Sequence, residues 1–558
     1  MANLDEEGPE TIPNSPDTLL LEDSFFSPKT NARLRGDFAR LVPVNHNAVL
    51  AFHSIAERVK LEPDWQPHIR RFLFIEDTPR AVSPEWDGAS DTNSDATSPL
   101  PTQVLTGYYR LSLDLISNHP RLGWVIGSGR RDLPNGGVDL LLTLQRNKDH
   151  VHGRHARLMH AQNGALMLVA GKGKPVTVNG IERLDGSQRV MGSVRTALAF
   201  GNLSYSLEFT GLNETSYRDK LGELFTKLNP DGDIPPMSLE LTPLEHHHEL
   251  HGFLIHSPFA SGASGVVSAG FEKSTGQAVA IKRVKRTPAT VARIQLEIQI
   301  YRKIGDHPNL CHLMADFYSG GDQYSTGKSK INDVYLVHSP LARQTFLDLM
   351  VSKKPYDIRL SAFYQVLKGL AHLHQHGIMH RDLKPTNMMV VSYQPVHAII
   401  IDYGSATFDT TSVDHYCGTI AYLAPEVLKL KYDKNKHLRH DAYDCRVDIW
   451  SMGLSGYQLF FQEACRWEKG ASSAAQKDII RRLRSRPGSI AGLLERMLSW
   501  SNVERPSADE VLQHHKIWSK LGDIDNAAAT DEAYQPSAAA KRLKAPLQRQ
   551  VSPSKSHT

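Results

Sequence analysis

Cysteine is scarce in this 558-residue chain, which contains only Cys311, Cys417, Cys445 and Cys465. All four lie in the C-terminal half, and their spacing fits neither a disulfide scaffold nor a metal site. No run of about 18 consecutive apolar residues occurs, so we expect no membrane-spanning helix and no membrane partner. The first 30 residues are acidic and lack a long apolar stretch, which argues against a secretory signal. These absences predict a soluble protein of the cytoplasm or the nucleus.

A large excess of charge of one sign is also absent. The 64 Lys and Arg side chains outnumber the 60 Asp and Glu side chains by only four. Net charge therefore gives no reason to expect direct nucleic-acid binding. Hydrophobic residues make up 40% of the chain and charged residues 22%, which is ordinary for globular proteins and excludes disorder along the whole chain. A chain of this length should hold two or three domains.

Changes in composition divide the chain into segments. Residues 1–104 contain 17 acidic and nine basic residues among Ser-Pro and Thr-Pro dipeptides, which predicts a mostly disordered segment, with partial order only from Phe38 to Glu76. Residues 105–215 alternate short apolar runs with Gly-, Pro- and Asn-rich breaks, a pattern typical of a β-sandwich. A polar linker at 216–249 precedes residues 250–519, where a few strands are followed by long helical periodicities. Residues 520–558 are rich in Ala, Ser and Pro and are predicted to be a disordered basic tail.

Two patterns near the start of the 250–519 segment suit the phosphates of a nucleotide. Residues 259–267 read FASGASGVV, a strand-turn-strand whose backbone N–H groups can cover phosphates. Lys282 ends an apolar strand, so its ammonium needs an anionic partner, and Glu297 in the following helical stretch can reach it. Taken alone, each pattern also fits an ordinary turn or ion pair. The predicted nucleotide-binding residues are Phe259, Ala260, Ser261, Gly262, Ala263, Ser264, Gly265, Val266, Val267, Lys282 and Glu297.

A third pattern, HRDLKPTNMMV at residues 380–390, is far more specific, and it is followed by Asp402-Tyr403-Gly404. Asp382 can accept or orient the proton of an attacking hydroxyl group, and Lys384 can neutralise a transferring phosphoryl group. Asn387 and Asp402 carry the oxygen atoms that Mg²⁺ prefers as ligands. The predicted catalytic residues are therefore Asp382 and Lys384, and the predicted metal ligands are Asn387 and Asp402.

With these motifs, and with CGT at 417–419, YLAPE at 422–426 and DIWSMG at 448–453, residues 250–519 resemble the eukaryotic protein kinase domain. The resemblance implies a bilobal α+β fold, ATP and Mg²⁺ as cofactors, and protein substrates. Lys384 and the Gly-Thr pair resemble those of serine/threonine kinases. The resemblance also implies that Glu426 pairs with Arg505 and that Asp448 braces the catalytic loop.

The same resemblance implies how the kinase is regulated. Arg381 precedes the catalytic Asp382, and in this family phosphorylation of the activation loop usually neutralises unpaired charge at this position. We therefore predict that an upstream kinase raises activity by phosphorylating Thr410 or Thr411. An unregulated Ser/Thr-rich loop is the alternative. Ala260 in place of glycine and Tyr403 in place of phenylalanine depart from the family pattern without abolishing activity.

Residues 105–215 resemble a forkhead-associated (FHA) domain through IGSGR at 126–130, HGRHARL at 152–158 and VNG at 178–180. This resemblance implies binding of phosphothreonine-containing adaptor proteins through charge-assisted hydrogen bonds. His152 stands where the family has a phosphate-binding serine, and His155 is expected to support the fold. The predicted phosphopeptide-binding residues are Arg130, His152, Arg154 and Lys174. A structural or autoinhibitory sandwich is the alternative.

A phosphopeptide reader ahead of a kinase resembles the DNA-damage and meiotic checkpoint kinases, which implies signalling in the cell-cycle checkpoints. The first segment lacks a Ser-Gln/Thr-Gln cluster, and its Ser-Pro and Thr-Pro sites suggest input from proline-directed kinases instead. The basic run from Lys541 to Lys544 resembles a nuclear import signal. A pseudokinase scaffold that binds phosphopeptides is the second interpretation, and the complete set of predicted catalytic residues argues against it.

Overall fold

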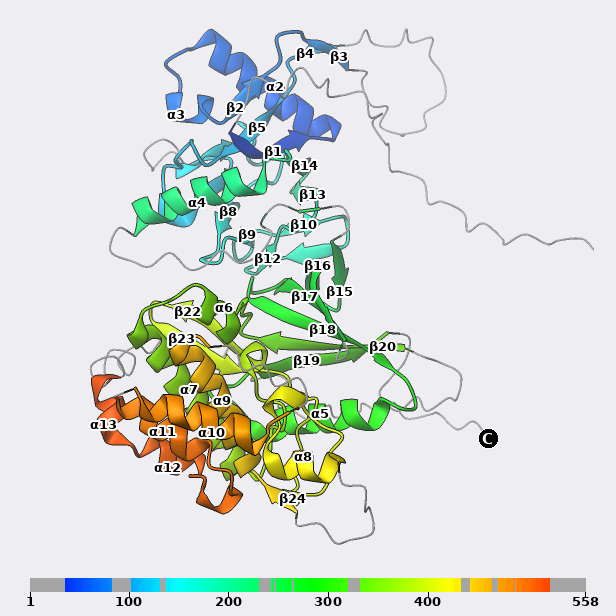
Figure 1. The fold of residues 1–558 in the computed structure, drawn as a ribbon. Coiled ribbons are helices and arrows are strands. Elements are labelled where there is room, and N and C mark those ends of the chain that lie inside the picture. Colours follow the sequence, from blue (N-terminus) through cyan, green and yellow to red (C-terminus); the bar gives the residue numbers. More distant parts are fainter. Residues whose placement is uncertain are drawn as a thin grey trace, which may run out of the picture.

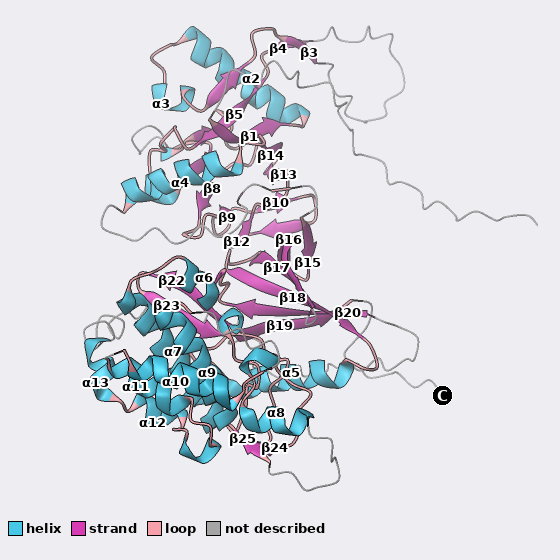
Figure 2. Cartoon of the chain, viewed as in Figure 1, coloured by secondary structure: helices cyan, strands magenta, loops and turns pink. Residues whose placement is uncertain are grey.

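The computed structural model describes residues 36–82, 102–130, 137–229, 241, 243–244, 247–262, 265–319, 332–432, 442–463, 470–486 and 488–521. In Figure 1 the first half of the chain forms a β-rich part, and the second half forms a sheet followed by a helical part. Figure 2 shows strands concentrated in the first two parts and helices in the third. No helix of the described part is long and apolar enough to cross a membrane. The predicted Lys541–Lys544 signal lies outside the described residues.

Within the described residues, the first part contains two large β-sheets, one separate two-stranded pair and three α-helices. One sheet has the strand order β11-β10-β13-β14-β1-β5-β2 and the other has the order β12-β9-β8-β6-β7. The strands of the first sheet are β1 (Asp37–Pro43), β2 (Leu73–Ile75), β5 (Gly107–Ser112), β10 (Val176–Val178), β11 (Glu182–Leu184), β13 (Arg195–Phe200) and β14 (Leu203–Phe209). Those of the second are β6 (Trp124–Gly127), β7 (Leu140–Leu141), β8 (Ala156–His160), β9 (Leu166–Ala170) and β12 (Gln188–Val190), while β3 (Arg80–Val82) and β4 (Thr102–Val104) form a separate pair.

This first part starts well before residue 105, so the expected boundary is wrong. Strand β1 lies inside the sheet and pairs with β14 on one side and β5 on the other. Helix α2 (His46–Leu61) follows, capped by the Asn45 side chain, which accepts a hydrogen bond from the backbone of Ala48. The helix buries Phe52, Ile55 and Val59 among other residues. The strand partners of β1 lie far away in the sequence, so the composition around β1 does not reveal them.

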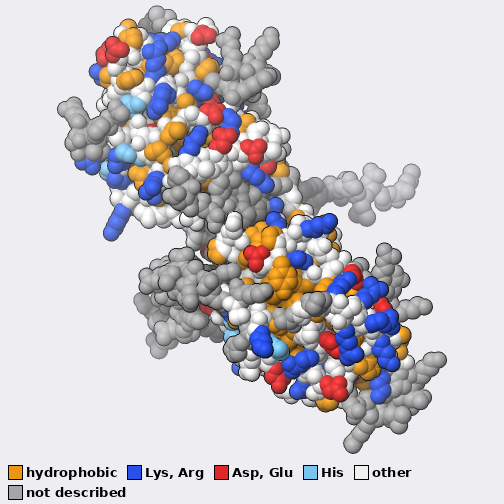
Figure 3. Space-filling model, turned by 60° about the vertical axis from the view of Figure 1, so that its left-hand side comes forward, with side chains coloured by type: hydrophobic (Ala, Val, Ile, Leu, Met, Phe, Trp, Pro, Cys, Tyr) orange, Lys and Arg blue, Asp and Glu red, His pale blue; other side chains and the backbone are white. Residues whose placement is uncertain are grey.

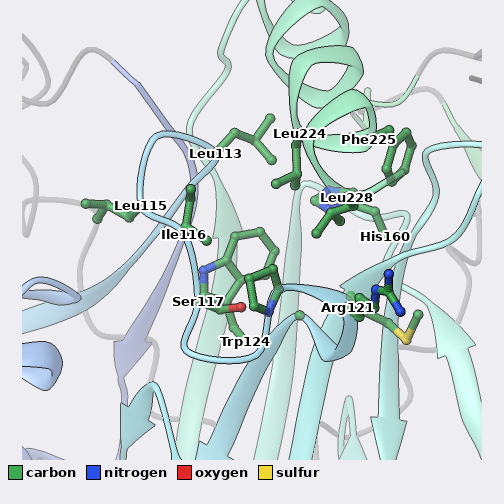
Figure 4. Close-up of a pocket in the computed structure, with 13 residues that line it drawn as sticks. Leu113, Leu115, Ile116, Ser117, Arg121, Trp124, His160, Leu224, Phe225 and Leu228 are labelled. Atoms are coloured by element: carbon green, nitrogen blue, oxygen red, sulfur yellow. The ribbon is translucent and has the colours of Figure 1, made fainter. Parts of the chain in front are cut away.

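The expected linker at 216–249 is also partly helical. Helix α4 (Glu214–Leu228) is capped by Asn213 and buries Tyr217 and Leu221 against the sandwich. Short helix α3 (Pro67–Arg70) lies in the segment before β2. An apolar pocket lies between α4 and the sandwich, and Figure 4 shows Leu224 and Phe225 of α4 on one side of it.

The second half of the chain has two lobes, as the resemblance implied. The N-terminal lobe is a sheet in the order β15-β16-β17-β18-β20-β19, and its described residues include one α-helix. Its elements are β15 (His248–Leu250), β16 (Phe253–Gly262), β17 (Gly265–Glu272), β18 (Ala278–Arg286), α5 (Val291–Ile304), β19 (His312–Tyr318) and β20 (Asn332–Ser339).

The C-terminal lobe is helical and is built around α9, whose residues are buried from Val447 to Phe460. Two small sheets, β21-β22-β23 and β24-β25, lie beside the helices. The elements of this lobe are β21 (Gln344–Thr345), α6 (Phe346–Val351), α7 (Tyr356–Gln375), β22 (Met388–Tyr393), β23 (Val396–Ile400), β24 (Thr411–Ser412), α8 (Pro425–Tyr432), β25 (Tyr443–Asp444), α9 (Arg446–Phe461), α10 (Ser473–Arg484), α11 (Ser489–Met497), α12 (Ala508–Leu512) and α13 (His515–Trp518).

The sandwich contacts the N-terminal lobe directly. The backbone N–H of Val190 in β12 donates to the carbonyl oxygen of Lys273 at 2.8 Å, and the Asn163 side chain donates to the carbonyl oxygen of Gly276 at 2.7 Å. Leu254 and Phe271 of the lobe belong to the same buried apolar cluster as the sandwich core. On the face drawn in Figure 3, basic and acidic side chains lie side by side, in keeping with the small net charge.

We predict that Phe38→Ala destabilises the sandwich by about 3–5 kcal/mol, because it removes a ring at the centre of an aromatic cluster. Phe38 is 1% exposed and contacts the rings of Trp124, Phe209 and Tyr217. Urea unfolding followed by circular dichroism measures the loss. Val44→Ala, at a position 38% exposed just after β1, is the control and should change stability by less than about 1 kcal/mol. Equal effects of the two substitutions would contradict a core role for β1.

Candidate active site

A buried lysine joins three parts of the second half. Lys282 on β18 lies 2.8 Å from Glu297 Oε1 on α5 and 2.8 Å from Asp402 Oδ1 beyond β23. Burial alone would lower the pKa of Lys282, but the two carboxylates outweigh burial and raise this pKa. Burial would likewise raise the pKa of Asp402, yet Lys282 holds it below its usual value. Lys282 and Asp402 are therefore charged at neutral pH, and the expected pairing of Lys282 with Glu297 is confirmed.

A column of aromatic rings links α5 to the loop that carries Asp382. The ring of Tyr301 lies 4.8 Å from that of Tyr403, and the Tyr403 ring lies 5.6 Å from that of His380, measured between centroids. Tyr403 is 1% exposed, so its ring packs as a phenylalanine ring would. Its hydroxyl group donates to the carbonyl oxygen of Ile400 at 3.4 Å, so the extra oxygen is hydrogen-bonded.

The carboxylate of Asp382 is held by three side chains. Lys384 Nζ lies 2.9 Å from Asp382 Oδ2, and the Thr419 hydroxyl group donates to Asp382 Oδ1 at 2.8 Å. Lys384 also donates to the Thr419 hydroxyl oxygen at 2.8 Å, which closes a triangle. The Asn387 amide donates to Asp382 Oδ2 at 3.2 Å and to the backbone carbonyl oxygen of Asp382 at 2.8 Å. In the sequence, Thr419 is noted only as part of the Gly-Thr pair, because its contact with Asp382 spans 37 positions.

The loop itself is fixed by the fully buried Asp448 of α9. Its two carboxylate oxygens accept the backbone N–H groups of His380 and Arg381, each at 2.8 Å. The predicted bracing role of Asp448 is therefore confirmed. His374 of α7 lies 3.0 Å from Asp448 Oδ2, a partner that the sequence did not suggest. Burial alone would lower the pKa of His374, but the hydrogen bond to Asp448 outweighs it and raises this pKa to about 9.

The predicted phosphate lid is the hairpin of β16 and β17. Val267 lies opposite Lys282 in the sheet, so the lid and the lysine are neighbours. Gly265 has a φ of +131°, and a Cβ atom there would lie 2.5 Å from the carbonyl oxygen of Arg283, so only glycine fits. Ala260 pairs with Val267 in β16, where a methyl group is tolerated. Ala263 and Ser264 lie outside the described residues.

The two predicted metal ligands are joined through the backbone, because the N–H of Ile401, next to Asp402, donates to the carbonyl oxygen of Asn387 at 3.0 Å. Asn387 is buried and Asp402 has a φ of +63°, and their amide and carboxylate oxygens suit Mg²⁺. Among the residues that the structure describes, no group of three His, Cys, Asp or Glu side chains could hold a metal ion alone. A divalent ion here would thus depend on these two side chains together with nucleotide phosphates and water. Such an ion would neutralise the negative charge of the phosphates.

The positive charge of Arg381 is not unpaired, in contrast to the expectation from the sequence. Its Nη1 atom lies 3.1 Å from Asp414 Oδ2, and its Nε atom donates to the carbonyl oxygen of Ser405 at 2.7 Å. Thr410 is exposed, and Thr411 lies in β24 opposite Asp444 of β25. Neither threonine contacts Arg381 through an observed hydrogen bond. The Arg381 guanidinium group, which was expected to pair with a phosphate, therefore already pairs with the Asp414 carboxylate.

In the sandwich, the predicted anion-binding residues gather around one loop. The Arg130 side chain lies against Gly153, since a Cβ atom on Gly153 would be 2.6 Å from Arg130 Cγ. Lys174 Nζ donates to the carbonyl oxygen of Arg154 at 2.7 Å. Partial burial and the nearby cations Lys174 and Arg146 lower the pKa of His152. The loop is therefore rich in positive charge.

His155 ties this loop to its neighbours. The His155 ring is 1% exposed, and its Nδ1 atom accepts the backbone N–H of His152 at 3.2 Å. Its Nε2 atom lies 3.0 Å from the carbonyl oxygen of Pro175. These contacts suit the structural role that the sequence predicted for it.

We predict that His374→Gln destabilises the protein at pH 6 and has a smaller effect above pH 9. The unfolded pKa of histidine is about 6.5, and the pKa of His374 in the fold is about 9. The stabilisation from protonated His374 is therefore fully present below about pH 6.5 and is lost as the pH rises to about 9. Urea unfolding at several pH values measures it. The exposed His376→Gln is the control, and an equal pH dependence of both variants would contradict the prediction.

Comparisons with known proteins agree with this geometry. Residues 255–517 match the family model described as "Protein kinase domain". The mitogen-activated protein kinase hog1 of Neosartorya fischeri is 27% identical over 314 residues, which cover 49% of this chain and 79% of that protein. A probable myosin light chain kinase of Dictyostelium discoideum is 30% identical over 222 residues, which cover 38% of this chain and 66% of that protein.

A solved structure of Rad53 residues 1–466 in complex with AMP-PNP is 19% identical, with a TM-score of 0.43. The match covers 71% of this chain and 91% of that one. From the family model and the kinase relatives, this chain contains a bilobal protein kinase domain, a type of domain that uses ATP and a divalent metal ion and acts on protein substrates.

Proposed function

We propose that the chain is a serine/threonine kinase that transfers the γ-phosphate of ATP to Ser or Thr hydroxyl groups of proteins. The observation that carries this proposal is the triangle of Asp382, Lys384 and Thr419. This triangle holds the Asp382 carboxylate, which orients the acceptor hydroxyl group. It also keeps the Lys384 ammonium group within hydrogen-bonding distance of that carboxylate. Because phosphoryl transfer depends mainly on positioning and charge neutralisation, these are the contributions that the protein must make.

Each group has one task in the proposed step. Lys282, held by Glu297, would bind the phosphates of ATP, and Asn387 and Asp402 would hold the metal ion, which would neutralise phosphate charge. Asp382 orients the acceptor hydroxyl group and takes its proton as the oxygen–phosphorus bond forms and the bond to ADP breaks. Lys384 neutralises charge on the transferred phosphoryl group.

The scaffold interpretation is disfavoured by the same contacts. Lys282 lies 2.8 Å from both Glu297 and Asp402 in a buried site, and well-packed apolar residues would stabilise such a site at least as well as buried charges do. The Asn387 side chain also donates hydrogen bonds to Asp382. A protein that only binds phosphopeptides has no need for this arrangement.

The test is Mg²⁺-dependent transfer from labelled ATP to a generic protein acceptor, followed by identification of the phosphorylated amino acid. Asp382→Ala should lower the rate by at least about 100-fold, because general-base catalysis contributes about 10²–10⁴. Thr386→Ala, at an exposed position of the same loop, is the matched control and should keep its activity. Phosphotyrosine as the product would refute the serine/threonine assignment. ATP binding without any transfer would favour the scaffold.

We also propose that the sandwich is an FHA domain that reads phosphothreonine in adaptor proteins. Support comes from the cations around the loop at 152–155 and from the backbone hydrogen bonds that fix this loop through His155. A phosphate dianion requires charge-assisted donors, and Arg130, Arg154 and Lys174 supply them. His152 adds a further donor when it is protonated.

Calorimetry with a threonine-phosphorylated peptide library tests this proposal on the full chain. Arg130→Ala should weaken binding by at least about tenfold, the equivalent of about 1.4 kcal/mol. Arg70→Ala removes the same charge from an exposed position on α3 and should leave the affinity unchanged. Unphosphorylated peptides should not bind. Equal binding by the Arg130 variant, or no binding at all, would favour a structural or autoinhibitory sandwich.

The order of the two domains further supports a role in DNA-damage, meiotic or cell-cycle checkpoint signalling. In this proposal the reader brings the kinase to phosphorylated adaptors, and proline-directed kinases act on the first segment. The run from Lys541 to Lys544 supports a nuclear location, with the cytoplasm as the alternative.

A further inference from the structure

Arg381 has an acidic partner supplied by the chain itself. Its guanidinium group is largely buried, with 9% of the side chain exposed, whereas the Asp414 side chain is 45% exposed. The other observed partners of Arg381 are neutral oxygens, namely the Ser405 carbonyl oxygen and the Tyr443 hydroxyl group at 3.3 Å. Asp414 therefore supplies the one negative charge that the observed contacts of Arg381 include.

The position of Asp414 is itself well defined. Its second carboxylate oxygen accepts the backbone N–H of Tyr416 at 2.9 Å, and its own backbone N–H donates to the Ser412 hydroxyl oxygen at 3.1 Å. The Tyr443 hydroxyl group donates to its carbonyl oxygen. With both carboxylate oxygens engaged, Asp414 is fixed in place before any modification.

Arg381 connects Asp414 to the catalytic loop. Its backbone N–H is one of the two groups bound by Asp448, and Asp382 is the next residue. Met379 and Thr407 also exchange two backbone hydrogen bonds, at 3.1 and 3.0 Å. These bonds join the catalytic loop to residues 402–426, the activation segment. An anion that holds the Arg381 guanidinium group therefore also fixes the segment that carries Thr407 and Asp414.

We propose that Asp414 is the positioning residue that holds Arg381 and the activation segment in working geometry, so that the kinase reaches full activity without phosphorylation of Thr410 or Thr411. This inference rests on the proposed kinase function. It replaces the expectation from the sequence, which assumed an unpaired Arg381. A carboxylate is an adequate substitute for phosphate here because one charge-assisted contact is made.

The location of Thr411 supports the same conclusion. Thr411 lies directly opposite Asp444 in the β24–β25 ladder, and opposite residues of such a pair have Cβ atoms about 4.5–5.5 Å apart. A phosphate on Thr411 would therefore stand beside the Asp444 carboxylate, which already pairs with Arg446 at 2.8 Å. The phosphate would have to compete with this carboxylate for the same cation, and like charges at opposite positions are destabilising.

The test compares full-length proteins that have been treated with a protein phosphatase, which is then removed. Treated wild-type protein should keep its kcat within about twofold, while Asp414→Asn should lower kcat about tenfold, or about 1.4 kcal/mol. The KM for ATP should not change, because Lys282 and Asp402 keep their contacts. Asp414→Glu should restore part of the loss. Asp409→Asn and the Thr410→Ala/Thr411→Ala double variant are the controls and should stay within about twofold of wild type.

Hydrogen exchange gives a readout that does not depend on catalysis. Backbone amides of residues 405–416 should exchange faster in Asp414→Asn than in Asp409→Asn, whose carboxylate contacts Thr407 instead of Arg381. Loss of activity on phosphatase treatment, full activity of Asp414→Asn, or equal exchange in the two variants would each overturn the proposal. If no preparation transfers phosphate, the kinase function fails, and the exchange comparison still decides whether Asp414 orders the segment.

Discussion

The buried carboxylate of Asp448 is the constraint on which the catalytic loop depends. It accepts two consecutive backbone N–H groups, those of His380 and Arg381, and it also contacts the His374 side chain. A charge without solvent contact is tolerable only when hydrogen bonds satisfy it, and this one has three partners. The next residue, Asp382, has its backbone direction set by this arrangement, so α9 positions the Asp382 carboxylate.

The second constraint is the buried ion cluster of Lys282, Glu297 and Asp402. Each member lies on a different element, and the charges compensate one another only when β18, α5 and the segment after β23 come together. Removing one partner would leave an unpaired charge in a site of low polarity, which costs several kcal/mol. The geometry of the nucleotide site therefore depends on how closely the two lobes approach each other. The rings of Tyr301 and Tyr403 add an apolar contact to the same connection.

The sequence identified those parts of the site whose chemistry is contiguous. Asp382, Lys384 and Asn387 lie within six positions, so one short pattern predicts that they lie together, and the structure places Lys384 and Asn387 in contact with Asp382. It missed contacts made across the fold, such as those of Thr419 with Asp382 and of Asp414 with Arg381, because no local pattern marks a single Thr or Asp in a loop. Partial order was expected from Phe38 to Glu76, but the place of strand β1 (Asp37–Pro43) inside the sheet was missed for the same reason. Its partners β5 and β14 follow it by about 70 and 170 residues, and only their pairing shows that an acidic, proline-containing region holds a central strand.

The contact between the sandwich and the N-terminal lobe gives the two halves a fixed relation. Gly192 lies so close to Leu254 that a Cβ atom would be 2.0 Å from its Cδ2 atom, so the surfaces meet without room for a side chain. Lys273 pairs with Glu182 of the sandwich and with Glu249 of its own lobe, but these groups are partly exposed, and such pairs contribute little stability. The apolar burial of Leu254 and Phe271 contributes more. The sandwich is thus attached to the sheet that carries Lys282, and a phosphopeptide bound to it would be held at a defined place relative to the nucleotide site.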